Sequence, residues 1–561
     1  MNDGKICVSV CAETADELIE QIKRAESLAD VIEIRFDCLE ATEFESALQK
    51  ISNLKFEKPF LATFRPRNKY ADLTPAKRLY KNDEERELHR INSEYRYSGW
   101  EKILKLKNID YVDFEYDIHS KLLWNMMFIN FWGTKFDAKR ERELALKLKG
   151  RKLIFSEHYF LREVIDLEET FRRLAEEIEA DNDEPEEKNF LNPAIIKIAA
   201  QADEITNTIP IWRLLEKAKS ENKQIIPIAM GEAGKWTRIL GLAHGAFMTY
   251  AALDEKSATA PGQITAREMI EVYRVRELNE QTEVYGIIGG NTSYSKSPYL
   301  QNAAFKYRGL NAVFVPLQVR NLDEFVRRMV KPETREIELN FKGFAVTIPH
   351  KTEIIKYLDE IDRTAQEIGA VNTVKIENGK LYGYNTDAQG FIKPLKNSFR
   401  DLKNAKVAVL GAGGAARACV YALKKEGAEV MIFVRNIERA KTLAEEFQVK
   451  LRQLSTNNQQ RTTNFNDFDI LVNATPLGTK GEFENETPAF ADEIKNVSLC
   501  YDLVYNPQQT RFLREAESVN IPTIGGLEML VAQGAEQFKI WTGLEAPIEE
   551  MRQSVIRKLQ S

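Results

Sequence analysis

A lysine inside an otherwise apolar segment is the first residue whose surroundings suggest chemistry. Lys197 lies in AIIKIAA, where Ile195 and Ala199 occupy the same face of a predicted strand. Burial among apolar side chains lowers the pKa of a lysine, which makes the neutral amine available to attack a carbonyl. A lysine that snorkels from a strand edge would give the same pattern. His158, at the end of another predicted strand, adds an imidazole that titrates near neutral pH and favours the catalytic interpretation.

Other charged residues lie near further predicted strand ends. Glu33 and Arg35 are two residues apart and therefore share a face, and Arg65 ends a third strand. Because the C-terminal ends of barrel strands form the active site, we expect these residues, Lys197 and His158 to belong to one catalytic site.

Eight short apolar segments are the predicted strands that position these residues. They are ICVSV (6–10), VIEIRF (31–36), PFLATF (59–64), YVDFEY (111–116), KLIFSEH (152–158), AIIKIAA (194–200), QIIPIAM (224–230) and GAFMTYAAL (245–253). Charged helical stretches lie between most of them. Eight βα units over about 250 residues predict a closed (β/α)8 TIM barrel, whose strand C-termini form the active site. We interpret the acidic segment 181–189 as a solvated loop.

The first half resembles type I 3-dehydroquinate dehydratase. The matching pieces are Ser9, EIRFD (33–37), TFR (63–65), SEH (156–158), KIA (197–199), Met230-Gly231, Arg238 and ATAPGQ (258–263). The resemblance implies that Lys197 forms a Schiff base with the ketone of dehydroquinate and that His158 moves the protons. It also implies a set of substrate contacts: Ser9, Glu33, Arg35, Arg65, Arg238, Thr259 and Gln263. Relatives usually have a glutamate that orients the histidine where Lys69 stands here, and a serine where Thr259 stands.

The second half holds another pair of ionisable residues. Lys351 ends GFAVTIPHK and Asp387 ends GYNTD, each after a short apolar or aromatic run. A lysine beside a carboxylate in a cleft can pass a proton to a carbonyl oxygen that is being reduced; on a surface the two would form an ordinary ion pair. Ser295 and Ser297 stand where Pro298 can start a helix, and their hydroxyls could hold a carboxylate or cap that helix.

A glycine-rich turn indicates a dinucleotide. The predicted strand KVAVL (406–410) leads into GAGGAAR (411–417), a helix and a second strand, EVMIFV (429–434). This matches G-x-G-x-x-A, and the helix N-terminus offers free N–H groups to a pyrophosphate. A glycine turn can also serve packing alone. Arg435 and Arg439 follow the second strand, where an NAD-binding fold has an acidic residue, so we expect NADP(H).

The second half resembles shikimate dehydrogenase. Its blocks occur in order: SxSP (295–298), VTxPxK (346–351), GAxNT (369–373), NTD (385–387), GAGGAA (411–416), NATPLG (473–478), DLVYNP (502–507) and GLEMLVxQ (526–533). The resemblance implies that Lys351 and Asp387 are catalytic. The implied substrate contacts are Ser295, Ser297, Thr347, Asn372, Tyr505 and Gln533. The implied cofactor contacts are Gly411, Ala412, Gly413, Gly414, Ala415, Arg435, Arg439, Thr475, Leu503 and Gly526.

Composition narrows the class of protein. A net charge of −6 gives no reason to expect a nucleic-acid partner, and no apolar run approaches the ~20 residues of a membrane helix. The N-terminus resembles neither a signal peptide nor a transit segment. The cysteines are scattered without metal-ligand spacing, so we expect reduced thiols, a cytoplasmic protein and no metal site. They are Cys7, Cys11, Cys38, Cys419 and Cys500.

These observations predict a bifunctional α/β enzyme of the shikimate pathway, which leads to aromatic amino acids. The expected domains are a TIM barrel at 1–278, a substrate-binding domain at 283–390 completed by C-terminal helices at 528–561, and a Rossmann NADP-binding domain at 391–527. The resemblances imply dehydration of 3-dehydroquinate, then reduction of 3-dehydroshikimate to shikimate with NADPH. We expect small-molecule substrates and neither nucleic-acid nor membrane partners, and the sequence leaves channelling and oligomeric state open. Three alternatives stay open: oxidation of quinate by the second half, an inert or scaffolding barrel, and an NADP-binding regulator.

Overall fold

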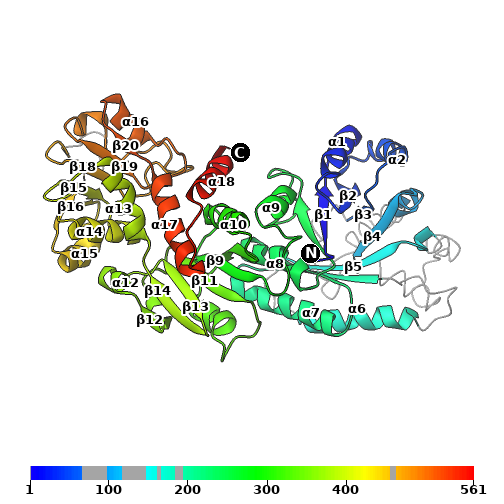
Figure 1. Ribbon diagram of the computed structural model, residues 1–561. Coiled ribbons are helices and arrows are strands. Elements are labelled where there is room, and N and C mark those ends of the chain that lie inside the picture. The colour runs from blue at the N-terminus through cyan, green and yellow to red at the C-terminus, as the bar shows by residue number, and fades with distance from the viewer. Residues whose placement is uncertain are drawn as a thin grey trace, which may run out of the picture. The chain divides into compact units, whose positions relative to one another are not determined.

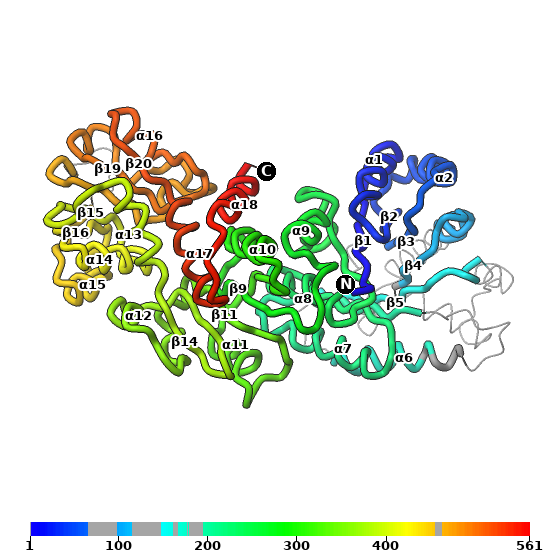
Figure 2. The backbone as a smooth tube through the Cα atoms, viewed as in Figure 1, coloured from blue at the N-terminus to red at the C-terminus, as the bar shows by residue number. Residues whose placement is uncertain are grey.

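The computed structural model describes residues 2–65, 98–115, 147–160, 166–182, 194–454 and 463–560 (Figure 1; Figure 2). The chain divides into two compact units: the first is Met1–Thr282 with Glu336–Glu338, and the second is Glu283–Arg335 with Leu339–Ser561. Within the described ranges no helix is long and apolar enough to cross a membrane. Lys69 lies outside the described residues.

The first unit is built on one sheet of eight parallel strands in the order β7-β6-β5-β4-β3-β2-β1-β8. The strands are β1 (Lys5–Val10), β2 (Val31–Arg35), β3 (Phe60–Thr63), β4 (Ile109–Glu115), β5 (Lys152–Tyr159), β6 (Ala194–Gln201), β7 (Ile225–Met230) and β8 (Met248–Ala252). The two edges meet where the Phe247 N–H donates to the Ile225 carbonyl at 2.9 Å. The sheet is therefore a nearly closed barrel, and all eight predicted strands are confirmed.

Helices that bury one apolar stripe follow most of these strands. They are α1 (Ala15–Ala25), α2 (Phe44–Ser52), α6 (Leu167–Asn182), α7 (Ile209–Ser220), α8 (Lys235–Leu240) and α9 (Ala266–Glu271). In α1 the Thr14 hydroxyl caps the N-terminus, and Leu18, Ile22 and Ala25 are buried at i, i+4 and i+7. The predicted acidic loop is wrong at its start, because α6 runs through Asp181 and Asn182. The rest of that segment lies outside the described residues.

The interior of the barrel is layered because alternate strand residues point inward. One apolar layer takes a residue from each strand: Cys7, Val31, Leu61, Tyr111, Ile154, Ile195, Ile226 and Met248. Two residues further along each strand comes a mostly polar layer: Ser9, Glu33, Thr63, Asp113, Ser156, Lys197, Ile228 and Tyr250. Two residues further again come Arg35, Arg65 and His158. The polarity of the core thus increases towards the C-terminal ends of the strands.

One cysteine prediction is wrong. Cys11 and Cys38 form a disulfide, with Cα atoms 5.5 Å apart, whereas Cys7, Cys419 and Cys500 are free and buried. Cys11 follows β1 and Cys38 closes the short 3-10 turn after β2, so the parallel pairing of these strands brings the two thiols together. The two cysteines are 27 residues apart in the sequence, and this spacing alone did not predict their contact. The cysteines therefore no longer support the cytoplasmic expectation.

The second unit begins with a mixed sheet in the order β10-β9-β11-β13-β14-β12. Its strands are β9 (Glu283–Gly289), β10 (Ala312–Gln318), β11 (Phe341–Val346), β12 (Glu360–Ile361), β13 (Thr373–Glu377) and β14 (Lys380–Tyr384). The helices α10 (Ser297–Tyr307), α17 (Gly526–Thr542) and α18 (Ile548–Gln560) share one hydrophobic cluster with β9 and β10. The C-terminal helices therefore pack on this sheet, although they end the chain.

A second, fully parallel sheet follows in the order β17-β16-β15-β18-β19-β20. Its strands are β15 (Lys406–Leu410), β16 (Glu429–Val434), β17 (Lys450–Gln453), β18 (Ile470–Asn473), β19 (Leu499–Asp502) and β20 (Thr523–Ile524), with helices α13 (Asp387–Ser398), α14 (Gly414–Lys425), α15 (Lys441–Phe447) and α16 (Arg511–Ser518). β15 pairs with both β16 and β18, so the strand order reverses there, as in a Rossmann fold. The expected border at 390/391 falls inside α13, whose Phe391 and Leu395 belong to the core around β15.

Candidate active sites

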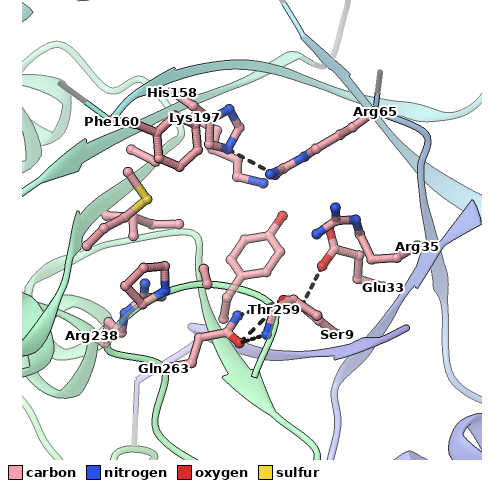
Figure 3. A pocket seen from close by; sticks show the side chains of 16 residues that line it. Ser9, Glu33, Arg35, Arg65, His158, Phe160, Lys197, Arg238, Thr259 and Gln263 are labelled. Carbon is pink, nitrogen blue, oxygen red and sulfur yellow. Dashed lines mark hydrogen bonds between the residues drawn. The ribbon is translucent and has the colours of Figure 1, made fainter. Parts of the chain in front are cut away.

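One pocket opens at the polar end of the barrel, and every residue of the predicted first site lines it (Figure 3). The lining includes Ser9, Glu33, Arg35, Arg65, His158, Lys197, Arg238, Thr259 and Gln263. The barrel geometry explains the convergence, because inward-pointing residues near the C-terminal ends of parallel strands face a common centre.

Lys197 is sealed in the barrel and paired with a residue that the sequence reasoning missed. Its Nζ donates to Asp113 Oδ2 at 2.6 Å, and the two side chains are only 2% and 1% exposed. Burial alone would raise the pKa of Asp113, but the charges of Lys197 and Arg65 outweigh it and hold the pKa below its usual value. The carboxylate therefore offsets the cost of burying a cation beside apolar walls. On its other side, Nζ lies 4.2 Å from the centroid of the Tyr250 ring.

His158 lies in the same pocket as Lys197 (Figure 3). The imidazole Nε2 is 2.9 Å from the Arg65 guanidinium, and the ring stacks on Phe160 with centroids 6.1 Å apart. Burial and the positive charges of Arg65, Lys197 and Arg35 hold the pKa of His158 well below its usual value. The imidazole is therefore neutral at physiological pH and can accept a proton.

Arg238 is a buried cation whose hydrogen-bond donors the fold does not fully use. The side chain is 3% exposed, and its Nε and one terminal nitrogen have no hydrogen-bond partner among the described residues. Burial lowers its pKa to about 10. Unsatisfied donors on a buried cation are costly, and a carboxylate would satisfy them. Arg35, by contrast, already donates to Asp37 at 3.0 and 2.6 Å.

Short polar contacts shape the rest of the pocket. Glu33 accepts hydrogen bonds from the hydroxyls of Ser9 and Thr63, the latter at 2.7 Å. Gln263 Oε1 accepts from the Thr259 N–H at 2.7 Å, which fixes the loop that carries both residues. Gly262 in this loop has a φ of +72°, and a Cβ there would lie 2.2 Å from the Gly231 carbonyl oxygen. The loop therefore needs glycine to approach the end of β7.

In the second unit, strand pairing brings Lys351 to Asp387. The chain leaves β11 towards Lys351, and the antiparallel pairs β11–β13 and β13–β14 place Asn372 and Asp387 beside it. Lys351 Nζ donates to Asp387 Oδ2 at 2.5 Å, and Asn372 Nδ2 donates to Oδ1 at 2.8 Å. The side chains of Lys351 and Asp387 are 17% and 8% exposed. The pair is therefore not the ordinary surface ion pair that the sequence left open.

Asn372 contacts this pair directly, and the other predicted substrate contacts lie on separate segments of the second unit. The Ser295 hydroxyl accepts from the Ser297 N–H at 3.2 Å at the start of α10, so it helps to cap that helix. Thr347 packs on the end of β9, where a Cβ at Gly289 would lie 2.5 Å from Thr347 Cγ2. Burial and the nearby Tyr294 raise the pKa of Tyr505 to about 12. Gln533, in α17, packs against Gly390 of α13.

The glycine turn has the geometry of a phosphate cradle next to Lys351. Gly411 has a φ of +108°, and a Cβ there would lie 2.9 Å from the Ala474 carbonyl oxygen and 3.2 Å from Thr475 Cγ2. α14 begins at Gly414 without a side-chain cap, which leaves its first N–H groups open. A Cβ at Gly414 would lie 3.4 Å from Lys351 Cδ. The turn and the ion pair therefore adjoin.

The other predicted cofactor contacts lie at the C-terminal ends of the parallel strands. Thr475 donates to Asn473 Oδ1 at 2.6 Å just beyond β18, and Gly526 packs on the Leu503 carbonyl beyond β19. Arg435 and Arg439 are exposed after β16. Neither guanidinium has a carboxylate partner within the described part of the chain. The guanidinium groups of Arg435 and Arg439 are therefore available to bind a phosphate.

Two residues of the first site escaped the sequence reasoning although a signal was present. Asp113 and Tyr250 stand two residues after Tyr111 and Met248, which are members of the apolar layer. Lys197 stands in the same relation to Ile195. Alternate residues of a strand share a face, so the residue two positions after each member of the apolar layer also points inward. This rule places Asp113, Lys197 and Tyr250 in one layer.

Together, the fold and the two sites define a class: an α/β protein that joins a barrel with a buried amine to a dinucleotide-binding unit with a lysine–aspartate pair. The model of the type I 3-dehydroquinase family matches residues 6–280. Three further models match: shikimate dehydrogenase substrate binding domain at 287–374, shikimate/quinate 5-dehydrogenase at 394–489 and shikimate 5′-dehydrogenase C-terminal domain at 526–556.

Known proteins match over the whole chain and over its second half. The chloroplastic bifunctional 3-dehydroquinate dehydratase/shikimate dehydrogenase of Arabidopsis thaliana is 33% identical, over 98% of this chain and 83% of that protein. The NADP(+) shikimate dehydrogenase of Methanocaldococcus jannaschii is 42% identical, over 50% of this chain and 99% of that protein. A solved shikimate dehydrogenase in complex with NADP+ is 41% identical over 51% of this chain, with a TM-score of 0.46. The chain belongs to the family of bifunctional 3-dehydroquinate dehydratase/shikimate dehydrogenases.

Proposed function

We propose that this chain catalyses two successive steps of the shikimate pathway. The barrel dehydrates 3-dehydroquinate to 3-dehydroshikimate, and the second unit reduces that product to shikimate with NADPH. The observation that carries the first assignment is a single pocket with a buried lysine, a neutral imidazole and an arginine whose donors lack partners. A carboxylated ketone satisfies all three groups.

In the barrel, Lys197 acts as the nucleophile. The neutral His158 takes one proton from the Lys197 ammonium, and the freed amine bonds to the ketone carbon. The oxygen leaves as water with that proton and one from the nitrogen, which restores the neutral imidazole and gives a protonated imine that faces Asp113. The imine draws electrons from the neighbouring carbon, so the neutral His158 can remove a proton there. The same imidazole, now charged, returns the proton to the hydroxyl that leaves as water. Water then hydrolyses the imine, which breaks the carbon–nitrogen bond, releases 3-dehydroshikimate and restores the Lys197 amine. Arg238 holds the substrate carboxylate with the donors that lack partners.

In the second unit, Lys351 supplies the proton. The glycine turn, the α14 N-terminus and Arg435 would hold a phosphorylated dinucleotide such as NADPH, which would supply the hydride for reduction of the substrate ketone. Both carboxylate oxygens of Asp387 accept hydrogen bonds, so the aspartate holds Lys351 in place and Lys351 has the proton to give. Ser295, Ser297, Thr347, Asn372, Tyr505 and Gln533 form the substrate side of the cleft.

A coupled assay tests both assignments at once. Dehydroquinate with NADPH should cause NADPH oxidation by the full chain without an added enzyme. Oxidation that requires added dehydroshikimate would leave the second activity alone and support an inert barrel.

Borohydride added with dehydroquinate should fix an adduct on Lys197 and none in Lys197→Ala. A higher rate with quinate and NADP+ than with shikimate would favour the quinate alternative. The cytoplasmic location stays a prediction, for which cell fractionation is the test.

A further inference from the structure

A tyrosine in the barrel has a hydroxyl that the fold itself does not use. Tyr250, in β8, belongs to the same inward layer as Lys197 and lines the pocket. The residue is 4% exposed, and its Oη has no hydrogen-bond partner among the described residues. A buried hydroxyl without a partner is costly, and phenylalanine would fill the same space without that cost. The hydroxyl therefore points to a partner that is present only when the pocket is filled.

The position of the ring relates this hydroxyl to the reacting nitrogen. Lys197 Nζ lies 4.2 Å from the ring centroid, while Asp113 binds Nζ at 2.6 Å. When Nζ bonds to the ketone carbon, the ketone oxygen lies two bonds from Nζ. At that separation the oxygen can reach the edge of the Tyr250 ring that carries the hydroxyl. Burial, with the nearby Cys7, Glu33 and Asp113, raises the pKa of the Tyr250 hydroxyl well above its usual value. The phenol therefore stays protonated and is a hydrogen-bond donor at every working pH.

We propose that Tyr250 Oη donates a hydrogen bond to the oxygen of the substrate ketone while Lys197 adds to the carbonyl carbon. The inference rests on the proposed dehydratase function. As the carbon–nitrogen bond forms, the π electrons of the carbonyl move to oxygen, and a donor aimed at that oxygen stabilises the charge that develops. The oxygen then leaves as water with two protons, one still on the nitrogen and one that His158 took from the Lys197 ammonium before the attack. The protonated imine keeps the remaining proton of the amine. Tyr250 itself keeps its proton throughout.

The test compares Tyr250→Phe with a matched control. Tyr111→Phe removes a hydroxyl from another inward strand residue of the barrel that is also 4% exposed and does not line the pocket. For Tyr250→Phe we expect kcat/KM of the dehydratase and the rate of borohydride-trapped adduct formation to fall together by about 10-fold, or about 1.4 kcal/mol. The melting temperature should not fall, because an unsatisfied hydroxyl is removed. Reduction of dehydroshikimate by the same chain should be unchanged, and Tyr111→Phe should match the wild type in both dehydratase measurements.

Three results would overturn the proposal. Wild-type rates in Tyr250→Phe would show that the hydroxyl does not stabilise the addition of Lys197 to the carbonyl. A fall in kcat with an unchanged trapping rate would place its role after carbonyl addition. Equal losses in Tyr250→Phe and Tyr111→Phe, with a lowered melting temperature, would show a packing role. Failure of the proposed function looks different, because the wild-type chain would then neither dehydrate dehydroquinate nor form the adduct.

Discussion

Replacing Arg238 by methionine should stabilise the barrel and abolish tight binding of dehydroquinate. The guanidinium is buried without a partner for two of its nitrogens among the described residues, and burial lowers its pKa to about 10. Relative to an ordinary arginine, this depression corresponds to about 3 kcal/mol. Because the charged form is the disfavoured one, this cost is fully present below pH 10 and disappears as the pH rises above that value and through the range in which an unfolded arginine loses its proton.

Methionine keeps the unbranched stem and removes the charge, with a packing mismatch of about 1 kcal/mol. The folded barrel should gain about 2 kcal/mol, which raises its melting temperature by about 4–8 °C. Hydrogen exchange of peptides from β6 and β7 reports the first unit alone, so the second unit does not obscure the result. In the wild type, dehydroquinate at 100 times its Kd should add about 2.7 kcal/mol, and in the variant it should add nothing.

Arg238→Lys is the control, because it keeps the charge and loses the planar fork. We expect no stabilisation from it and weak binding. A methionine variant that is less stable than the wild type would refute the reasoning, since it would mean that the guanidinium is satisfied within the folded barrel. A stable variant that still binds dehydroquinate with wild-type Kd would refute the assignment of Arg238 to the carboxylate.

Three further predictions address the other groups. Lys351→Met and Asp387→Asn should each lower kcat for dehydroshikimate reduction by about 10²–10⁴-fold while the dehydratase rate of the same chain is kept; parallel loss of both activities would mean misfolding. Arg435→Ala should raise KM for NADPH by about 10–100-fold and leave KM for NADH nearly unchanged, and equal effects would contradict a 2′-phosphate contact. Because surrounding charges and burial hold the pKa of His158 well below its usual value, its base form persists as the pH falls. The acid limb of the dehydratase kcat/KM profile should therefore lie below pH 6.5, the ordinary histidine value, and a limb above it would contradict a neutral His158.

Most strands of the barrel could be predicted from the pattern of apolar residues in the sequence. A parallel strand that is covered on both faces shows as a short apolar run, and a polar residue inside such a run stands out, which is how Lys197 was found. Asp113 was missed because an aspartate between Val112 and Phe114 of YVDFEY looks like the polar half of an alternating strand. Its role depends on which residue faces it across the barrel, and that partner lies 84 positions away in sequence. Local pattern carries no information on such a pairing.

The same limit explains the disulfide and the border of the second unit. Cys11 and Cys38 meet because two parallel strands end side by side, a contact that neither cysteine signals alone. The expected border at 390/391 divides α13 because the NTD motif that ends at Asp387 was assigned to the substrate-binding domain. Further along the same helix, Phe391 and Leu395 pack in the nucleotide-binding core. One helix can contribute residues to two domains, and a domain boundary inferred from the order of sequence motifs does not reveal this.

The two lysine–aspartate pairs differ in burial, and the difference suits their tasks. Lys197 and Asp113 are 2% and 1% exposed, so protons at Nζ exchange only through groups in the pocket. A nucleophile that must stay bonded to carbon through several steps benefits from this exclusion of water. Lys351 and Asp387 are 17% and 8% exposed, so Lys351 can recover its proton from solvent after each reduction. A proton donor that is used once per turnover needs such a supply. In the proposed mechanism the same two residue types therefore serve covalent catalysis where they are buried and acid catalysis where solvent reaches them.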